Sequence, residues 1–138
     1  MRNALLWLFI AVPVCTGAEP PCVKKVVVPD YPNLAYFARL QGSVSVQIEI
    51  GRHGEVLSAR ASGADKLLTQ AAEKNVLLWS FLPPPKSASV PVKHTVLYVY
   101  KIRGKPVAYN PEPVVVLYPP DRVEITIRPG TPLISWGT

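Results

Sequence analysis

The residues that could do chemistry in this chain are few and far apart. His53 lies in a Gly-x-x-Gly turn, and His94 lies in a run of alternating apolar residues. Neither histidine has a Cys, Asp or Glu at metal-ligand spacing. The only Gly-Ser pair, Gly42-Ser43, precedes a strand pattern and does not form a strand-to-helix nucleophile turn. The sequence therefore predicts no enzymatic activity, no metal site and no cofactor.

The elements that would position these residues begin with a strand over Ser43–Ile50. Its apolar members share one side, and this period of two indicates one buried and one wet face: Val44, Val46, Ile48 and Ile50. The two glycines of the Gly51–Gly54 segment predict a hairpin turn, because glycine takes positive φ without strain. A returning strand over 55–61 needs a β-bulge, since Val56 is out of phase with the alanines that follow.

Two helices flank this hairpin in the sequence. Tyr31-Pro32 predicts the start of the first helix, because proline suits the first helical position, and Gly42 is expected to end it. Ser62 and Asp65 have the spacing of a capping box, which predicts a second helix running through Trp79. Three prolines from Pro83 prevent any continuation. Trp79 and Phe81 are expected in the core.

The longest predicted strand runs from Val90 to Arg103, and Pro91 near its start favours an edge position. A second hairpin is predicted beyond it, with strands over 114–118 and 122–128. Three placements are open for this hairpin: it extends the sheet, covers an edge or pairs with another subunit. The predicted fold class is α+β, with two helices packed on one face of a small antiparallel β-sheet and an extra C-terminal β-hairpin.

The start of the chain resembles an export signal. Arg2 precedes an apolar run over 4–14 that is too short to span a bilayer, and Ala18 is a suitable last residue before cleavage. A lipid-anchored form would need a small residue just before Cys15 or Cys22. Val14 and Pro21 occupy those positions, so cleavage after Ala18 is favoured over lipid anchoring. Cys22 would then be the one remaining thiol, and the mature chain would have no transmembrane anchor. The expected organisation is a signal peptide over 1–18, an N-terminal leading segment over 19–29, a folded domain over 30–103 and a Pro-rich extension over 104–138.

Charge narrows the classes of partner. The chain has 15 basic and 9 acidic side chains, and removal of the signal takes away only one basic residue. A positive balance favours anionic partners. However, no basic run exceeds two residues, so nucleic-acid binding is not expected.

A spaced set of these residues resembles the C-terminal domain of TonB-family proteins. The resemblance extends from about Pro29 to Arg103, which is just over half of the chain. The matching residues within it are Tyr31, Pro32, Ala35, Gly42, Val44, Val46, Gly54, Val56, Leu68, Ala71, Ala72, Trp79, Phe81 and Pro83. The resemblance implies a periplasmic module that binds an extended segment of an outer-membrane transporter. In this family the segment adds as a strand to the sheet edge.

Two main hypotheses of function follow, the first from the resemblance and the second from the C-terminal hairpin; a third, a secreted enzyme, has no site that the sequence identifies. In the first, the chain is a periplasmic TonB-like protein-binding module linked to transmembrane transport. It would bind an envelope protein along the edge of the Val90–Arg103 strand, using these residues: Lys93, His94, Thr95, Val96, Leu97, Tyr98, Val99 and Lys101. In the second, it is a structural or assembly protein that forms a homodimer through the C-terminal hairpin, without a transporter ligand.

Overall fold

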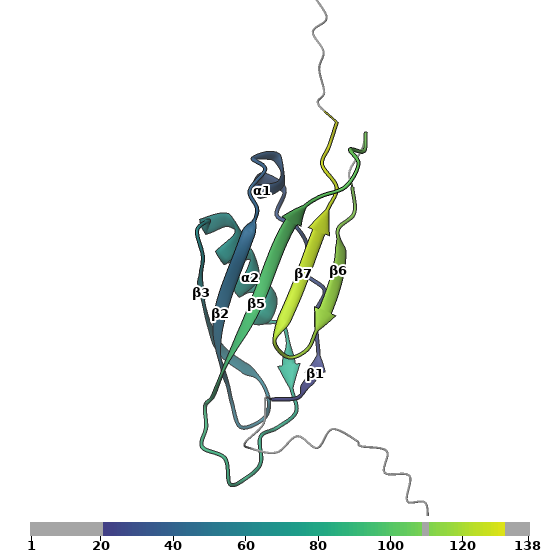
Figure 1. Ribbon diagram of the computed structural model, residues 1–138. Helices are drawn as coiled ribbons and strands as arrows, with labels where there is room; N and C mark the ends of the chain where they lie inside the picture. Colours follow the sequence, from purple (N-terminus) through teal and green to yellow (C-terminus); the bar gives the residue numbers. More distant parts are fainter. Residues whose placement is uncertain (1–20, 109–110, 132–138) are drawn as a thin grey trace, which may run out of the picture.

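The computed structural model describes residues 21–108 and 111–131 of the 138-residue chain (Figure 1). Two helices and seven strands occur in this part of the chain. In sequence order they are β1 (Val23–Lys25), α1 (Asn33–Phe37), β2 (Gly42–Ile50), β3 (Val56–Ser62), α2 (Lys66–Val76), β4 (Ser80–Phe81), β5 (Val92–Ile102), β6 (Val114–Tyr118) and β7 (Arg122–Ile127). The α+β class predicted from the sequence is confirmed.

Five strands form the main sheet in the order β3-β2-β5-β7-β6, while β1 and β4 form a small separate pair. The predicted antiparallel sheet was wrong in one respect. The sheet is mixed, because β5 and β7 run parallel. The chain leaves the end of β5, descends along β6 and returns as β7, which inserts between β5 and β6. Figure 1 shows α2 behind this sheet and α1 at its upper end, whereas the near face carries no helix.

The core lies between the sheet and the helices, and alternation within the strands determines its members. Buried apolar side chains come from β2, α2, β5 and β7, and from the segments next to them: Tyr31, Ala35, Val44, Val46, Ile48, Ile50, Leu68, Ala72, Val76, Trp79, Phe81, Val96, Tyr98, Tyr100, Val123, Ile125 and Ile127. Trp79 and Phe81 are therefore core residues, as predicted. The C-terminal hairpin contributes to this same core through the inward side chains of β7.

The boundaries of α1 differ from the prediction. Its N-cap is Pro32, and its end is set by Arg39, which has φ 57°. The Leu40 amide donates to the Ala35 carbonyl and the Arg39 amide to the Tyr36 carbonyl, which is the hydrogen-bond pattern of a Schellman C-cap. Gly42, the predicted helix stop, instead begins β2.

The boundaries of α2 also differ. Asp65 is the N-cap itself, because its carboxylate accepts from the Leu67 and Leu68 amides at 2.8 and 3.3 Å. The predicted capping box starting at Ser62 was wrong, since Ser62 is the last residue of β3. The helix ends at Val76 rather than Trp79, which follows in a turn.

The predicted turn over Gly51–Gly54 joins β2 and β3, and the predicted β-bulge is confirmed by a register shift between Glu49 and Ile50. Gly54 has φ 84°, and a Cβ there would lie 1.8 Å from the Phe81 carbonyl oxygen. That close approach lets the Phe81 amide donate to the Gly54 carbonyl at 2.8 Å. Glycine is therefore required at this position by both conformation and space.

The predicted signal peptide over 1–18 lies outside the described residues. Within the described part, none of the helices has the length and apolar character needed to cross a bilayer. Cys22 is disulfide-bonded in this structure of the full chain. The expectation of a lone thiol concerns the chain after cleavage and stays a prediction.

Candidate protein-binding edge

The β5 strand is not the open edge that its length and Pro91 had suggested. Pro91 precedes the first residue of β5 and so occupies no position in the ladder. From Leu97 to Ile102, β5 pairs with β7, and the Leu97 amide donates to the Asp121 carbonyl at 2.8 Å. At the far end, the Arg103 amide donates to the Ile127 carbonyl at 2.9 Å. The predicted binding edge is thus occupied by the protein's own last strand.

The eight predicted binding residues consequently fall into different environments. Leu97, Tyr98, Val99 and Lys101 lie in the ladder with β7, and the Val96 and Tyr98 side chains are buried in the core. Lys93, His94, Thr95 and Val96 precede the first β5–β7 pair, and the Lys93 and Thr95 side chains are exposed. The structure does not assemble the eight residues into one accessible surface.

His94 attaches the C-terminal hairpin to the rest of the sheet. Its Nε2 atom lies 3.2 Å from the Pro120 carbonyl oxygen and 3.2 Å from Asp121 Oδ1. On the helix-free face, Glu124 of β7 contacts both Arg122 and Lys101, the latter with 3.7 Å between Nζ and Oε1. These ion pairs are open to solvent on at least one side and contribute little stability, so apolar burial dominates the attachment of the hairpin.

The edge at β3 is capped by a side chain from α2. Glu73 Oε1 accepts a hydrogen bond from the Ala61 amide at 2.7 Å. Ala61 pairs with Val46 of β2 only on its other side, so this amide belongs to the outer edge of the strand. A carboxylate bound there occupies a donor that an added strand would need.

The β6 edge is uncovered within the part of the chain that the structure describes. No strand pairs with its outer side among the described residues, and its sequence Val-Val-Val-Leu-Tyr contains no charge, proline or glycine. Val114, Val116 and Tyr118 are 65%, 41% and 52% exposed, while Val115 and Leu117 pack toward the core. Natural sheets usually block such an edge with charges, bulges or a covering segment.

The register of the hairpin shows which backbone groups face outward. The Tyr118 carbonyl accepts from the Asp121 amide within the hairpin, so the backbone groups of Tyr118 point toward β7. Because direction alternates along a strand, the amides and carbonyls of Val115 and Leu117 point away from β7. The open edge therefore offers two donors and two acceptors to an added strand.

Asn75 is a buried polar residue that the sequence analysis did not select. Its Oδ1 atom accepts from Trp79 Nε1 at 3.0 Å and from the Tyr98 hydroxyl at 2.6 Å, and its Nδ2 atom donates to the Val27 carbonyl at 3.0 Å. It thus joins α2, β5 and the segment before α1. A signal was present in the sequence, since Asn75 follows Ala72 by three residues on the apolar stripe of α2.

The family-motif residues are structural. Tyr31 donates from its hydroxyl to the Leu40 carbonyl, and Ala35 and Val44 are buried behind the sheet. Burial, and secondarily the negative charge of Asp65, raises the pKa of Tyr31 to about 12. Burial likewise raises the pKa of Tyr98 and of Tyr100. The Tyr100 hydroxyl has no hydrogen-bond partner among the described residues. The remaining motif residues lie at element ends or turns: Pro32, Gly42, Gly54, Val56 and Pro83.

The described residues contain no group of three or more His, Cys, Asp and Glu side chains that could hold a metal ion. The absence of an enzymatic activity stays a prediction.

These features define a small α+β domain whose mixed sheet has one capped edge and one open, apolar edge. The sequence matches the family described as the Gram-negative bacterial TonB protein C-terminal over residues 27–102. This match covers more than half of the chain, and the protein belongs to that family. It ends at the last residue of β5, so β6 and β7 lie beyond it. Neither the curated proteins nor the solved structures include a significant match to the chain.

Proposed function

We propose that the protein is a periplasmic protein-binding module of the TonB type that takes up an extended segment of an outer-membrane transporter or another envelope protein. Family membership links the chain to TonB-type envelope transport and to envelope proteins as partners. The observation that carries the proposal is the uncovered β6 edge with its exposed apolar side chains.

The proposed mode of binding is strand addition at β6. The guest backbone would pair with the outward amides and carbonyls of Val115 and Leu117, which supply affinity that does not depend on sequence. Alternate guest side chains would lie beside Val114, Val116 and Tyr118 on the helix-free face, and these contacts would set the preference for particular segments. The β5 edge, assigned from the sequence, is replaced here by the edge that the hairpin itself provides.

A proline at position 115 tests this mode directly. Val115→Pro removes an outward amide and leaves the hydrogen bonds between β6 and β7 in place, and proline is tolerated on edge strands. Titration with peptides from the extended segments of outer-membrane transporters should show binding at least about fivefold weaker, because one hydrogen bond is worth roughly 1 kcal/mol. Val115→Thr is the matched control, since it retains the backbone donor and the branched shape at the same position. Equal affinity of Val115→Pro and the unchanged protein would refute strand addition at β6.

A second candidate function uses the same edge for assembly. Two copies of β6 could pair antiparallel about a two-fold axis and make a homodimer without a transporter ligand. Light scattering over a range of protein concentrations distinguishes the two functions. A dimer that Val115→Pro converts to a monomer, together with no affinity for transporter peptides, favours assembly. A monomer that binds such peptides favours the transport-linked module.

Export through a cleavable signal forms part of the proposal. The apolar run over 4–14 and the small residues before Glu19 support it. Expression of the full chain in a Gram-negative host followed by N-terminal sequencing of the periplasmic fraction should give a mature protein that starts at Glu19. Retention of residues 1–18 would contradict this part of the proposal.

A further inference from the structure

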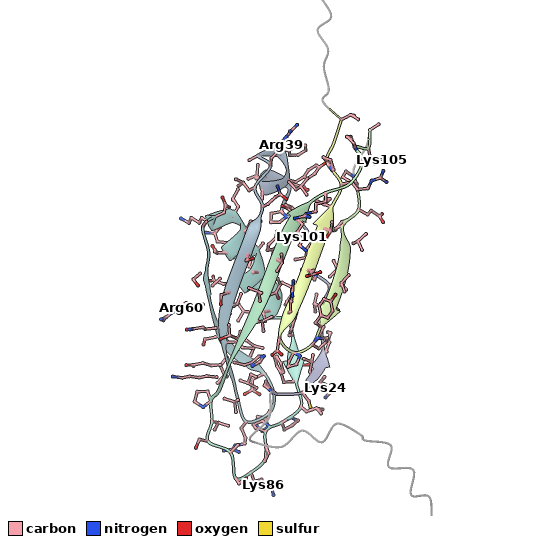
Figure 2. All side chains as sticks on the ribbon, viewed as in Figure 1. Lys24, Arg39, Arg60, Lys86, Lys101 and Lys105 are labelled. Atoms are coloured by element: carbon pink, nitrogen blue, oxygen red, sulfur yellow. The ribbon has the colours of Figure 1, made fainter. Side chains whose placement is uncertain are left out.

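One end of the molecule combines unpaired positive charge with exposed apolar side chains. Figure 2 shows Arg39 and Lys105 at the same end, where α1 and the last residues of β5 and β7 also lie. Arg103 and Arg128 belong to this end as well, because Arg103 follows β5 and Arg128 Nε donates to the Lys105 carbonyl at 3.0 Å. We call these four exposed residues, Arg39, Arg103, Lys105 and Arg128, the basic end.

The four residues of the basic end form no ion pair with any other described residue. The charged contacts within the described residues lie elsewhere, on His94, Asp121, Lys101, Arg122 and Glu124. The acidic residues nearest in sequence are Asp30, Glu112 and Glu124, and Glu124 already contacts Lys101 and Arg122. Counting Asp30 and Glu112 still leaves an excess of positive charge. Charges that are not neutralised within the protein are available to an anionic partner.

A hollow of about 700 Å³ lies at this end, between α1 and the segments that follow β5 and β7. Tyr36 and Phe37 line it from α1, and Arg39, Arg103 and Gly130 line it from the surrounding segments. Tyr36 fixes one wall, since its hydroxyl donates to the Arg128 carbonyl at 3.0 Å. The hollow is therefore bounded by aromatic rings and two guanidinium groups.

Two large apolar side chains beside the basic end are exposed to solvent. Leu34 is 69% exposed and Phe37 is 76% exposed. They are three residues apart on α1 and so lie on the same face of the helix. The buried member of this helix is Ala35, which means that packing against the core does not require either side chain.

Arg39 adds an independent observation. It occupies the left-handed C′ position of α1 with φ 57°, where glycine is the usual residue. A residue with a Cβ is destabilised in this conformation, so a non-glycine residue that adopts it motivates a hypothesis of function. Here the outlier places a guanidinium group in the wall of the hollow.

We propose that the basic end is a membrane-contact site that docks on an anionic phospholipid surface. Lipid phosphates would pair with the four cations, and Leu34 and Phe37 would enter the boundary between headgroups and acyl chains, as apolar residues do in interfacial helices. An acidic peptide would satisfy the charges but would leave Leu34 and Phe37 in water. The combination of charge and exposed apolar surface therefore favours a lipid surface as the partner.

The decisive variant is Arg39→Gly, because stability and binding should change in opposite directions. Glycine relieves the backbone at φ 57° and should raise the urea midpoint of unfolding, while loss of the guanidinium should weaken binding to vesicles. The measurement is flotation of the full chain with phosphatidylcholine vesicles that contain or lack phosphatidylglycerol. Each lost cation should weaken partitioning about fivefold, and Phe37→Ser should weaken it about tenfold or more.

Lys86→Gln is the matched control, since it removes one exposed cation at the opposite end of the molecule (Figure 2). Arg103→Gln gives the same change of charge within the basic end. The proposal holds if Arg39→Gly and Arg103→Gln weaken binding to anionic vesicles and Lys86→Gln does not. It is overturned if binding does not require phosphatidylglycerol, if all three variants behave alike, or if an acidic peptide binds the basic end while anionic vesicles do not.

Discussion

Ile125→Ala tests whether the C-terminal hairpin is an integral part of the domain. The family match ends at residue 102, which would allow β6 and β7 to be an accessory to a core that is complete without them. In the structure, however, Ile125 is fully buried and lies in register between Tyr100 of β5 and Val115 of β6. Its truncation leaves a cavity at the centre of the sheet, within the same core that the helices cover.

The expected loss is about 2–5 kcal/mol, the range for isoleucine to alanine at fully buried positions. With a urea m-value of about 1.5 kcal/mol/M, the midpoint of unfolding should fall by roughly 1–3 M in a single transition. Ile48→Ala in β2 should cost a similar amount, because Ile48 is equally buried within the family-matched part. Val116→Ala, on the exposed face of β6, should cost no more than about 1 kcal/mol.

Far-UV circular dichroism follows the transition, and amide hydrogen exchange shows which strands open together. An integral hairpin predicts that Ile125→Ala lowers the protection of β2, β5 and β7 in parallel. The reasoning is refuted if the midpoint does not move, or if β7 loses protection while β2 and β5 retain theirs. A deletion of the whole tail is a poorer test, since it removes Val123, Ile125 and Ile127 from the core together.

Three further predictions concern the buried polar groups. Asn75→Ala should lower the free energy of unfolding by about 2–4 kcal/mol, because Trp79 Nε1 and the Tyr98 hydroxyl lose their acceptor in a buried site. Urea unfolding measures this loss, and a value below about 1 kcal/mol would contradict the role of Asn75. Tyr100→Phe should leave stability unchanged or raise it, since its hydroxyl has no partner among the described residues, whereas Tyr98→Phe should cost about 1 kcal/mol. The opposite order in thermal unfolding would show the assignment to be wrong. The pKa of Tyr31 is about 12 in the folded state, against an ordinary value of 10.0. The contribution of Tyr31 to stability is therefore complete below about pH 10 and is lost as the pH rises toward about 12, because the unfolded chain releases the hydroxyl proton first. Tyr31→Phe should make the alkaline decline shallower in unfolding experiments at graded pH, and an unchanged slope would exclude Tyr31 as its cause.

The sequence was sufficient to predict elements with a repeating apolar pattern. It was not sufficient to predict helix ends, which depend on single hydrogen bonds and backbone conformations. The alternation over Ser43–Ile50 predicted β2 correctly, because a side-chain period of two leaves only one face for the core. Helix ends were less predictable. Ser62 and Asp65 both suit an N-cap, and only the path of the chain shows that Asp65 accepts the amide hydrogen bonds. At α1, Arg39 takes the conformation that a glycine would ordinarily take, so the expected stop at Gly42 was displaced.

The strand that forms the candidate edge was predicted, but its place in the sheet was not. The run Val114–Tyr118 was identified as a strand of a C-terminal hairpin, and the structure places it there. Its position at the edge depends on the insertion of β7 between β5 and β6, which no local pattern encodes. The same insertion explains why the β5 assignment was wrong. Proline at position 91 suggested an edge, but that residue precedes the ladder and carries no information about the neighbour of β5.

The parallel pairing of β7 with β5 determines the order in which the sheet can form during synthesis. Every element of the family-matched part is synthesised before the strand that completes its sheet, and β6 must emerge first to lead that strand back. A growing chain therefore holds the amides of Leu97 and Arg103 without their final acceptors until Asp121 and Ile127 exist. During that interval the nascent domain has an unpaired edge on β5, which β7 later covers.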